Sequence, residues 1–483
     1  MTTSEAEPAS QGGQPGQKNS DTAGQLWLVV GLAAALIAFG LYADYWITQP
    51  YQKLMAPVDI RVYRDGGMIA LHRWPYYNPS RSSPLYDWPG FFNLKFTYTP
   101  FAAMVFSVLG VAKLWAWLKL SVMVSVACMV AAVWFTLGGL GYRKPDARKI
   151  GGTLIIASAM LYSEPVQRVL WLGQIELILM ALVMWDLCQP DDRDWKGVGV
   201  GIAAGIKLVP LIFIPYLILT RKYRQAAVAT GTFAATVALG FADLPKDSVQ
   251  WWFGGLFAQG SRTGFVGWEG NQSLEGMITR FAGSVAGSKP AWLAAAAVTL
   301  AIGLACAVIL DRAGHPVVAV LTCALVATLI SPISWDHHWV WIVPGITALA
   351  VYGVRASGAT RWSLLAAAGL ATTVFSTWIG ALWHKPPLDL SNFSLGLIWL
   401  PPNTPITWYY AIGDQPWYPE YHWHGLQLIS GNAFVFGGLA LFVLLVAITA
   451  RIVIQRRRSG RPLFTAAPVL PAAESLGEPA ALG

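Results

Sequence analysis

The sequence predicts an all-α polytopic membrane protein, with about twelve crossings if each span takes about 20 apolar residues. Of the 483 residues, 55% are hydrophobic and only 12% are charged, and the mean hydropathy is +0.49. Soluble proteins carry about twice that charged fraction. The 24 tryptophans suit a protein with two interfacial belts and large loops that face water. The composition therefore excludes an ordinary soluble domain.

The net charge of +8 and the pI near 9.2 would also fit a nucleic-acid-binding protein. In a membrane protein, however, a surplus of Lys and Arg is typical of cytoplasmic loops. The chain has no basic low-complexity arm, so we expect no nucleic acid partner. All four cysteines lie inside apolar segments, which indicates no disulfide framework.

The two ends of the chain read as tails around one membrane domain. Residues 1–24 are rich in Ser, Gln, Gly and Pro, which predicts a disordered cytoplasmic tail. The first apolar run, 26–46, is too long for a signal-peptide core and lacks a cleavage site, so it is expected to remain as a span. A single transmembrane catalytic domain is predicted over 25–455, followed by a basic, disordered cytoplasmic tail at 456–483.

The remaining apolar segments follow one another through this domain. We expect them at 96–111, 114–140, 150–163, 169–188, 198–219, 225–242, 290–310, 316–332, 338–354, 361–383 and 430–454.

Basic residues in short connections indicate the cytoplasmic side. Simple alternation cannot place every basic connection there, because segment 198–219 has basic residues at both ends. All the short basic connections fall on the cytoplasmic side if two segments do not cross the membrane in the ordinary way. Segment 96–111 would be a short re-entrant or juxtamembrane helix on the outer side. Segment 198–219, with Lys207 and Pro210 at its middle, would then enter and return as two half-helices. Alternatively, both segments cross and one basic connection breaks the rule.

In either arrangement three long loops fall on the outer, periplasmic side: 48–95, 243–289 and 384–429. The short turn 331–338 lies on the same side. Because the cytoplasmic loops are too short to build a nucleotide site, any chemistry is expected outside.

Two acids in the first outer loop are candidates for proton transfer. Asp59 and Asp65 are six residues apart, which is about 240° around a helix, so at most one faces a given cleft. Asp59 follows the first span closely, which places it near the membrane surface. Ion pairing with Arg61 or Arg64 at the surface is the alternative for either acid.

Lys207 lies near the middle of an apolar run. A lysine at the bilayer centre costs about 3 kcal/mol, so such a residue is expected to be functional. An anionic lipid head group is a natural partner, and pairing with an acid such as Glu176 is the alternative.

The turn Ser331–Trp339 contains Asp336, His337 and His338 between tryptophans. This pattern predicts proton transfer or phosphate binding. A metal site completed by His422 and His424 is less expected, because metal clusters usually show tighter ligand spacing. Otherwise the histidines merely cap helix ends.

Other polar and aromatic residues are candidates for substrate contact. Gln174 and Glu176 stand at the head of an apolar segment, while Asn271 and Gln272 follow a Gly-rich stretch. The third outer loop is rich in tryptophan, whose aromatic faces suit a substrate groove; an interfacial belt is the alternative. The full predicted substrate-binding set is Asp65, Gln174, Glu176, Asn271, Gln272, Asp336, Trp399, Trp408 and Trp417. We interpret the acidic run 191–194 as a solvated cytoplasmic charge run rather than a metal–nucleotide motif.

Six motifs in this order resemble the actinobacterial polyprenyl-phosphate-mannose-dependent alpha-(1→2)-mannosyltransferases, a family 87 type within the GT-C superfamily of membrane glycosyltransferases. Two positions depart from the family pattern: Thr99 stands where a proline is usual, and Glu176 where an asparagine is frequent. The resemblance does not extend to the third outer loop or to either tail. The motifs lie at 59–67, 96–100, 173–176, 205–210, 271–274 and 331–339.

The resemblance implies a GT-C fold in the plasma membrane, with the active site facing the periplasm. It implies a polyprenyl-phosphate-mannose donor, a phosphatidylinositol mannoside or lipomannan acceptor, and inversion at the sugar carbon. Asp59 would be the general base, and Lys207 with His337 or His338 would bind the donor phosphate. We expect no cofactor, no obligatory metal and a monomer among membrane lipids. An arabinofuranosyltransferase that uses decaprenyl-phosphate arabinose stays open, as does a transporter or flippase, although no internal repeat favours the latter.

Overall fold

The computed structural model describes residues 15–48, 57–73, 76–90, 94–377, 396–402 and 418–460. These ranges fold into α-helices and short 3₁₀ helices, and they contain no strand, only two isolated β-bridges. The all-α prediction is confirmed for this part of the chain.

The helices lie close to the predicted apolar segments. α1 begins at Pro15, inside the stretch 1–24 that the sequence predicts as a tail, and the remainder of both predicted tails lies outside the described residues. The longer helices are α1 Pro15–Thr48, α3 Val58–Ala70, α6 Leu114–Gly139, α7 Ala147–Met160, α9 Glu176–Leu187, α12 Tyr223–Asp243, α15 Val285–Arg312, α16 Pro316–Ile330, α17 Ile342–Arg355, α18 Gly358–Val374 and α22 Ala433–Arg458. The shorter ones are α4 Pro84–Asp87, α5 Pro100–Phe106, α8 Glu164–Leu172, α10 Val198–Ile206, α11 Phe213–Leu219, α13 Pro245–Trp252, α14 Leu274–Ala282 and α21 Leu426–Ser430, with 3₁₀ helices η2 Ser107–Gly110, η3 Val209–Ile212, η4 Leu256–Ala258, η5 Gly260–Arg262, η6 Asp336–Trp341, η7 Leu397–Trp399 and η8 Pro419–His422.

Five helices of the described part are long and apolar enough to cross a membrane: α1, α6, α12, α15 and α22. A sixth span arises if α8 and α9, which meet at an angle of 118°, form one broken span. Large apolar side chains on these helices are exposed, among them Leu36, Met123, Val298 and Val443. In water that exposure would be costly, whereas lipid matches it. The protein is therefore a multi-pass membrane protein, and the count of about twelve crossings stays a prediction.

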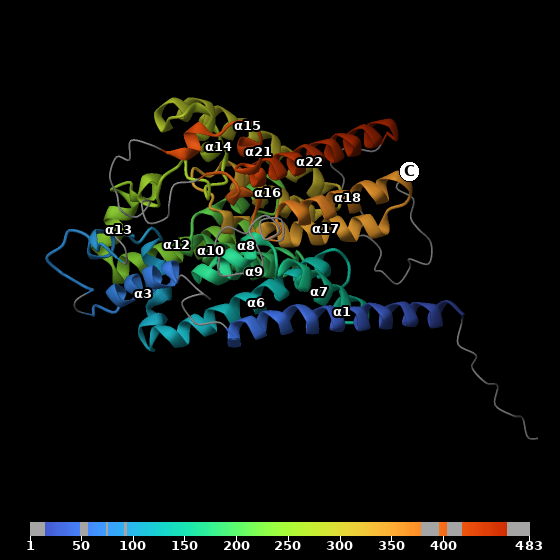
Figure 1. Ribbon diagram of the computed structural model, residues 1–483, viewed down its shortest axis with the longest axis horizontal. Coiled ribbons are helices and arrows are strands. Elements are labelled where there is room, and N and C mark those ends of the chain that lie inside the picture. Colours follow the sequence, from blue (N-terminus) through green and yellow to red (C-terminus); the bar gives the residue numbers. More distant parts are fainter. Residues whose placement is uncertain are drawn as a thin grey trace, which may run out of the picture.

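The long helices run along the longest axis of the molecule (Figure 1). Figure 1 shows the start of α1 and the end of α22 at one end, and α3 with α13 at the other. Basic connections gather at the first of these ends. Arg148 lies beside Gly24 in α1, and Arg355 donates a hydrogen bond of 2.7 Å to the Leu140 carbonyl. The positive charge of Arg456 helps to lower the pKa of His315, so these two residues are also near each other.

The acidic run at 191–194 lies among basic partners. Asp191 pairs with Lys196 at 2.7 Å and with Lys222 at 3.4 Å, while Asp194 is 98% exposed and contacts Arg224. These contacts fit the predicted charge run.

Both segments with unusual predicted paths are short or broken. Segment 198–219 is α10, an extended residue at Lys207, then η3 and α11, so the predicted break is present. Segment 96–111 holds only α5 and η2, which pack against α3. Segment 169–188 is also broken, at Gly173, where the sequence predicts a continuous helix.

α1 and α7 pack so closely that only glycine fits where they cross. A β-carbon on Gly31 would lie 2.6 Å from the Gly151 carbonyl oxygen, and one on Gly151 would lie 2.2 Å from the Trp27 carbonyl oxygen. Small residues allow such close approach of backbones between membrane helices.

Gly151→Ala is expected to lower the melting temperature of the detergent-purified protein by several degrees. The added methyl group must push two backbones apart, and overpacking of this kind costs about 1–3 kcal/mol. The matched control is Gly40→Ala on α1, where a β-carbon meets nothing within 4 Å. Equal melting temperatures for the two variants would show that the crossing tolerates separation.

Candidate active site

The break in the middle of segment 198–219 presents Lys207 to a cavity. Lys207 has extended backbone angles of −140° and 131° and follows the last residue of α10. The Thr99 hydroxyl donates to the free carbonyl of Gly205, and Pro210 in η3 has no N–H to continue a helix. A carbonyl of the unwound backbone thus has a hydrogen-bond partner in a neighbouring segment, as buried backbone groups require.

Gln174 and Glu176 lie at the break between α8 and α9, and of the two only Gln174 lines the cavity. Gly173 adopts a left-handed conformation with φ of 70°, which glycine reaches without strain. The Gln174 side-chain oxygen accepts hydrogen bonds from Ile175 N at 2.9 Å, from the Tyr98 hydroxyl at 3.3 Å and from the Tyr63 hydroxyl. Its Nε2 is therefore the donor that faces the histidine turn.

The histidine turn is held by the loop that carries Asn271 and Gln272. Gln272 N donates to Ser334 O at 2.8 Å, Ser334 N donates to the Asn271 side chain at 2.9 Å, and Asp336 N donates to Gly270 O at 2.9 Å. Asn271 and Gln272 are fully buried and neither lines the cavity. Their contact with substrate stays a prediction, while their contact with the turn is direct.

One cavity of about 300 Å³ is lined by six of the candidate residues: Asp59, Gln174, Lys207, Asp336, His337 and His338. It lies between α3, α8, the α10–η3 break, the segment from Trp251 to Trp268, and the histidine turn. The polar lining comprises Asp59, Lys95, Thr97, Tyr98, Thr99, Arg168, Gln174, Lys207, Gln259, Arg262, Thr263, Ser331, Asp336, His337 and His338.

Asp59 and Asp65 do occupy different sides of α3. Asp59 lies in the first turn and lines the cavity, whereas Asp65 does not and accepts a hydrogen bond of 3.4 Å from Trp88. Within the described ranges, Asp59 makes no hydrogen bond or ion pair. Burial raises the pKa of the Asp59 carboxyl, and the neighbouring His337 and Lys207 only partly oppose that rise.

Asp336 and His337 form a buried, oriented pair. Asp336 contacts Arg168 Nε at 2.9 Å through one oxygen and His337 Nδ1 at 3.1 Å through the other. His337 Nε2 lies 3.2 Å from Gln174 Nε2, a donor, so the proton of a neutral His337 belongs on Nδ1. Although burial alone would raise it, Arg168 and His337 hold the pKa of Asp336 below its ordinary value.

Lys207, Glu176 and His338 form a second cluster. The Lys207 ammonium contacts Glu176 Oε1 and lies 2.9 Å from His338 Nε2, and His338 Nε2 lies 3.4 Å from Glu176 Oε1. Because an ammonium only donates, His338 Nε2 must accept. Burial and the nearby Lys207 charge lower the pKa of His338 well below its usual range, so the ring is neutral.

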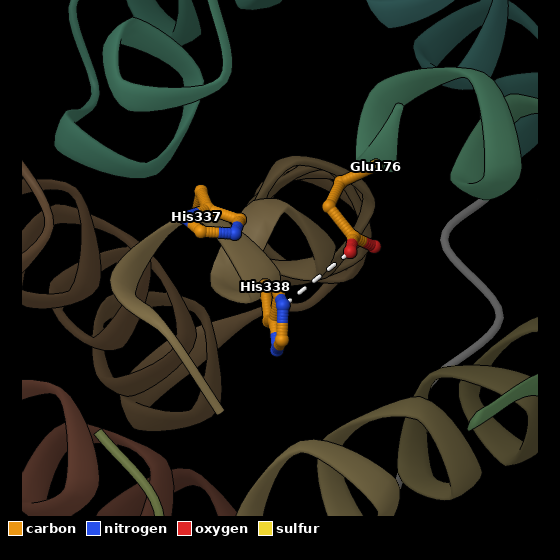
Figure 2. Close-up of side chains that lie close together, drawn as sticks. All are labelled: Glu176, His337 and His338. Carbon is orange, nitrogen blue, oxygen red and sulfur yellow. Dashed lines mark ion pairs between the residues drawn. The ribbon is translucent and has the colours of Figure 1, made fainter. Parts of the chain in front are cut away.

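Glu176 and His338 of this cluster, together with His337, are also residues of types that bind metal ions. The ligand atoms of Glu176, His337 and His338 lie within 4.8 Å of one another, and Figure 2 shows Glu176 and His338 pointing toward each other. Lys207 already supplies a positive charge in contact with two of these three residues. A metal ion would have to displace that ammonium, so the donor set fits a metal poorly.

Trp399 does not line the cavity but contacts residues of α8 next to it. Its ring NH donates a hydrogen bond of 3.0 Å to Glu164, and its ring lies 4.5 Å from the Arg168 guanidinium. Trp408 and Trp417 lie outside the described residues. Arg168, Tyr98 and Trp268 line the cavity but are absent from the predicted set. The cluster of polar residues from Glu164 to Glu176 was the available signal for Arg168.

Known proteins match this chain over the segments that build the site. The model of Glycosyltransferase family 87 matches residues 96–332. A polyprenol-phosphate-mannose-dependent alpha-(1-2)-phosphatidylinositol mannoside mannosyltransferase of Mycobacterium tuberculosis (strain ATCC 25618 / H37Rv) is 30% identical over 89% of this chain and 92% of its own length.

Two further relatives support the match. A polyprenol-phosphate-mannose-dependent alpha-(1-2)-phosphatidylinositol pentamannoside mannosyltransferase of Mycobacterium tuberculosis (strain CDC 1551 / Oshkosh) is 30% identical over 79% of this chain and 81% of its own length. A phosphatidylinositol mannoside mannosyltransferase of Mycolicibacterium smegmatis is 30% identical over 66% of this chain and 75% of its own length. The chain therefore belongs to glycosyltransferase family 87.

Proposed function

We propose that the protein transfers mannose from a polyprenyl-phosphate donor to a phosphatidylinositol mannoside and forms an alpha-(1→2) linkage. The names of the relatives support this donor, acceptor and linkage. The observation that carries the proposal is one cavity lined by a carboxylate, Asp59, and by an ammonium, Lys207, beside a neutral His338. Transfer from a lipid phosphate needs a group that accepts a proton and a group that stabilises phosphate charge.

Asp59 is the general base in this proposal. The bond between the sugar C1 and the phosphate oxygen breaks, and its electron pair stays on the phosphate. The acceptor oxygen bonds to C1, and its proton passes to the Asp59 carboxylate. Because the incoming oxygen attacks opposite the leaving phosphate, a beta-linked donor yields an alpha-linked product.

Lys207 binds the donor phosphate, and His338 or the Gln174-bonded His337 completes the phosphate site. A buried ammonium stabilises the negative charge that grows on the phosphate oxygens, since the site excludes bulk water. The Lys207 side chain is only 17% exposed, so its charge is weakly screened. The donor set fits a metal poorly, so we propose transfer without a metal ion or other cofactor.

The surroundings of the cavity suit lipid-linked substrates. Val249, Phe253 and Phe257 are 50%, 80% and 49% exposed, and Phe257 also lines the cavity. We assign this apolar rim to the membrane surface, where the lipid chain of a substrate leaves the cavity. The site then faces the periplasm, because the basic connections gather at the opposite end of the molecule. We also propose that the protein has the GT-C fold, lies in the plasma membrane and acts as a monomer.

Asp59→Asn is expected to bind donor but to lose turnover by about 10²–10⁴-fold, as loss of a general base does. The measurement is transfer of labelled mannose by purified protein, with a melting curve to show that the variant folds. Asp65→Asn, on the same helix but outside the cavity, should stay within a few-fold of wild type. If only the Asp65 variant loses turnover, the role belongs to Asp65.

The pH dependence of kcat/KM is expected to show an acid limb above the ordinary aspartate pKa of about 3.9. Burial raises the pKa of Asp59, and only the ionised carboxylate accepts a proton, so activity falls as the pH drops through that raised value. A profile of initial rates between pH 4 and pH 8 measures the limb. Activity that is flat down to pH 4 would contradict a raised pKa at the essential base.

Lys207→Met is expected to lower turnover by about 10²–10³-fold, the usual cost of removing one group that stabilises developing charge. Methionine keeps the apolar length of the side chain but leaves the buried Glu176 without its partner, so a melting curve must show that the variant is folded at the assay temperature. Lys119→Met, at an exposed position on α6, is the control for loss of a lysine. Unchanged turnover in the Lys207 variant would remove this residue from the phosphate site.

A further inference from the structure

Glu176 contacts Lys207 from outside the cavity lining. Lys207 lines the large cavity, but Glu176 does not. Both residues line a separate void of about 20 Å³ between α9, η3 and α16. Glu176 therefore contacts the ammonium at the small void, while a substrate phosphate would approach the ammonium from the large cavity.

Glu176 also offsets the positive charge available to a phosphate. Its carboxylate contacts the Lys207 ammonium and lies 3.4 Å from His338 Nε2, and the His338 ring is neutral. Asp59 and Tyr98 near this pair add no positive charge, while Arg168 and His337 both contact Asp336, whose carboxylate offsets positive charge on them. A phosphate at Lys207 thus meets an ammonium that is already paired.

The reaction changes the charge of the bound phosphate. The donor is a phosphodiester with one negative charge, and breaking its C1–O bond leaves a phosphate monoester. That product carries about −1.5 to −2 at pH 7, because its second pKa is about 6. Any cation that binds the donor phosphate attracts the product phosphate more strongly, which slows product release.

We propose that Glu176 is the counter-charge that keeps Lys207 from retaining the lipid monophosphate product. This inference rests on the proposed function. Glu176 repels the second negative charge of the product as it forms, and the repulsion falls more heavily on the product than on the donor. Glu176 is a positioning and charge-balancing residue and does not touch the reacting atoms.

The test is the affinity of the full-length detergent-purified protein for two soluble probes, measured by titration calorimetry. Farnesyl monophosphate stands for the product, and methyl farnesyl phosphate, a phosphodiester, stands for the donor. At pH 8 Glu176→Gln should tighten binding of the phosphodiester by about threefold and of the monophosphate by about tenfold, because the repulsion acts on each charge. At pH 5, where the monophosphate carries about one charge, both probes should tighten by about threefold.

Two control variants separate charge from shape. Glu176→Asp keeps the carboxylate, so the ratio of the two affinities should remain close to that of the wild type. Glu275→Gln, an acid on α14 outside the cavity, should change neither affinity. In mannosyl-transfer assays, the Glu176→Gln enzyme should also be inhibited by farnesyl monophosphate at about tenfold lower concentration, with a smaller change in donor KM.

Three outcomes would overturn the inference. Equal tightening of both probes at pH 8 would show that the product charge is irrelevant. Weaker binding in Glu176→Gln would show that Glu176 serves only to aim Lys207 at the phosphate. If the wild type bound neither probe at either pH, the proposed function would fail together with the inference, whereas the first two outcomes leave the proposed function intact.

Discussion

Burial of charge is the constraint on which this site depends. A charged side chain removed from water is costly unless an opposite charge or hydrogen bonds compensate it. Asp336 in η6 pairs with Arg168 in α8, and Lys207 pairs with Glu176 in α9. The contact of His338 in η6 with Lys207 joins the two pairs, so four elements are linked. Asp59 is the cavity acid for which the described residues provide no such partner, so both carboxylate oxygens are open to accept a proton.

The histidine turn is held in place by a loop whose own conformation depends on Arg280, a residue outside the cavity. Arg280 is fully buried and donates to the carbonyl oxygens of Trp268 at 2.9 Å and Asn271 at 3.0 Å, and to the Asn432 side chain at 3.0 Å. The loop that it shapes then pairs with the histidine turn through Gly270 and Gln272. Asn432, the residue before α22, thereby helps to hold the turn, and no described residue of the third outer loop or of α22 lines the cavity.

Much of the architecture is predictable from the sequence, because long apolar runs can only be membrane helices. The break at Lys207 is predictable too, since a lysine and a proline interrupt one run. The break at Gly173 is not, because a single glycine is common inside helices and only the tertiary bend reveals its left-handed conformation. Sequence alone offers Lys207 two partners, a lipid head group or Glu176; the structure shows the pair with Glu176, and the lipid phosphate remains a proposal. The contacts of Arg168 join segments far apart in the chain, which no local pattern encodes.

The most direct test of this account is a cryo-EM structure of the protein with a non-hydrolysable phosphonate analogue of polyprenyl-phosphate mannose. The account predicts a phosphonate oxygen within hydrogen-bond distance of Lys207 Nζ. It also predicts the Asp59 carboxylate on the opposite face of the sugar C1, where the acceptor hydroxyl attacks. Phosphonate density away from Lys207, or Asp59 on the same face of the sugar as the phosphonate, would contradict it.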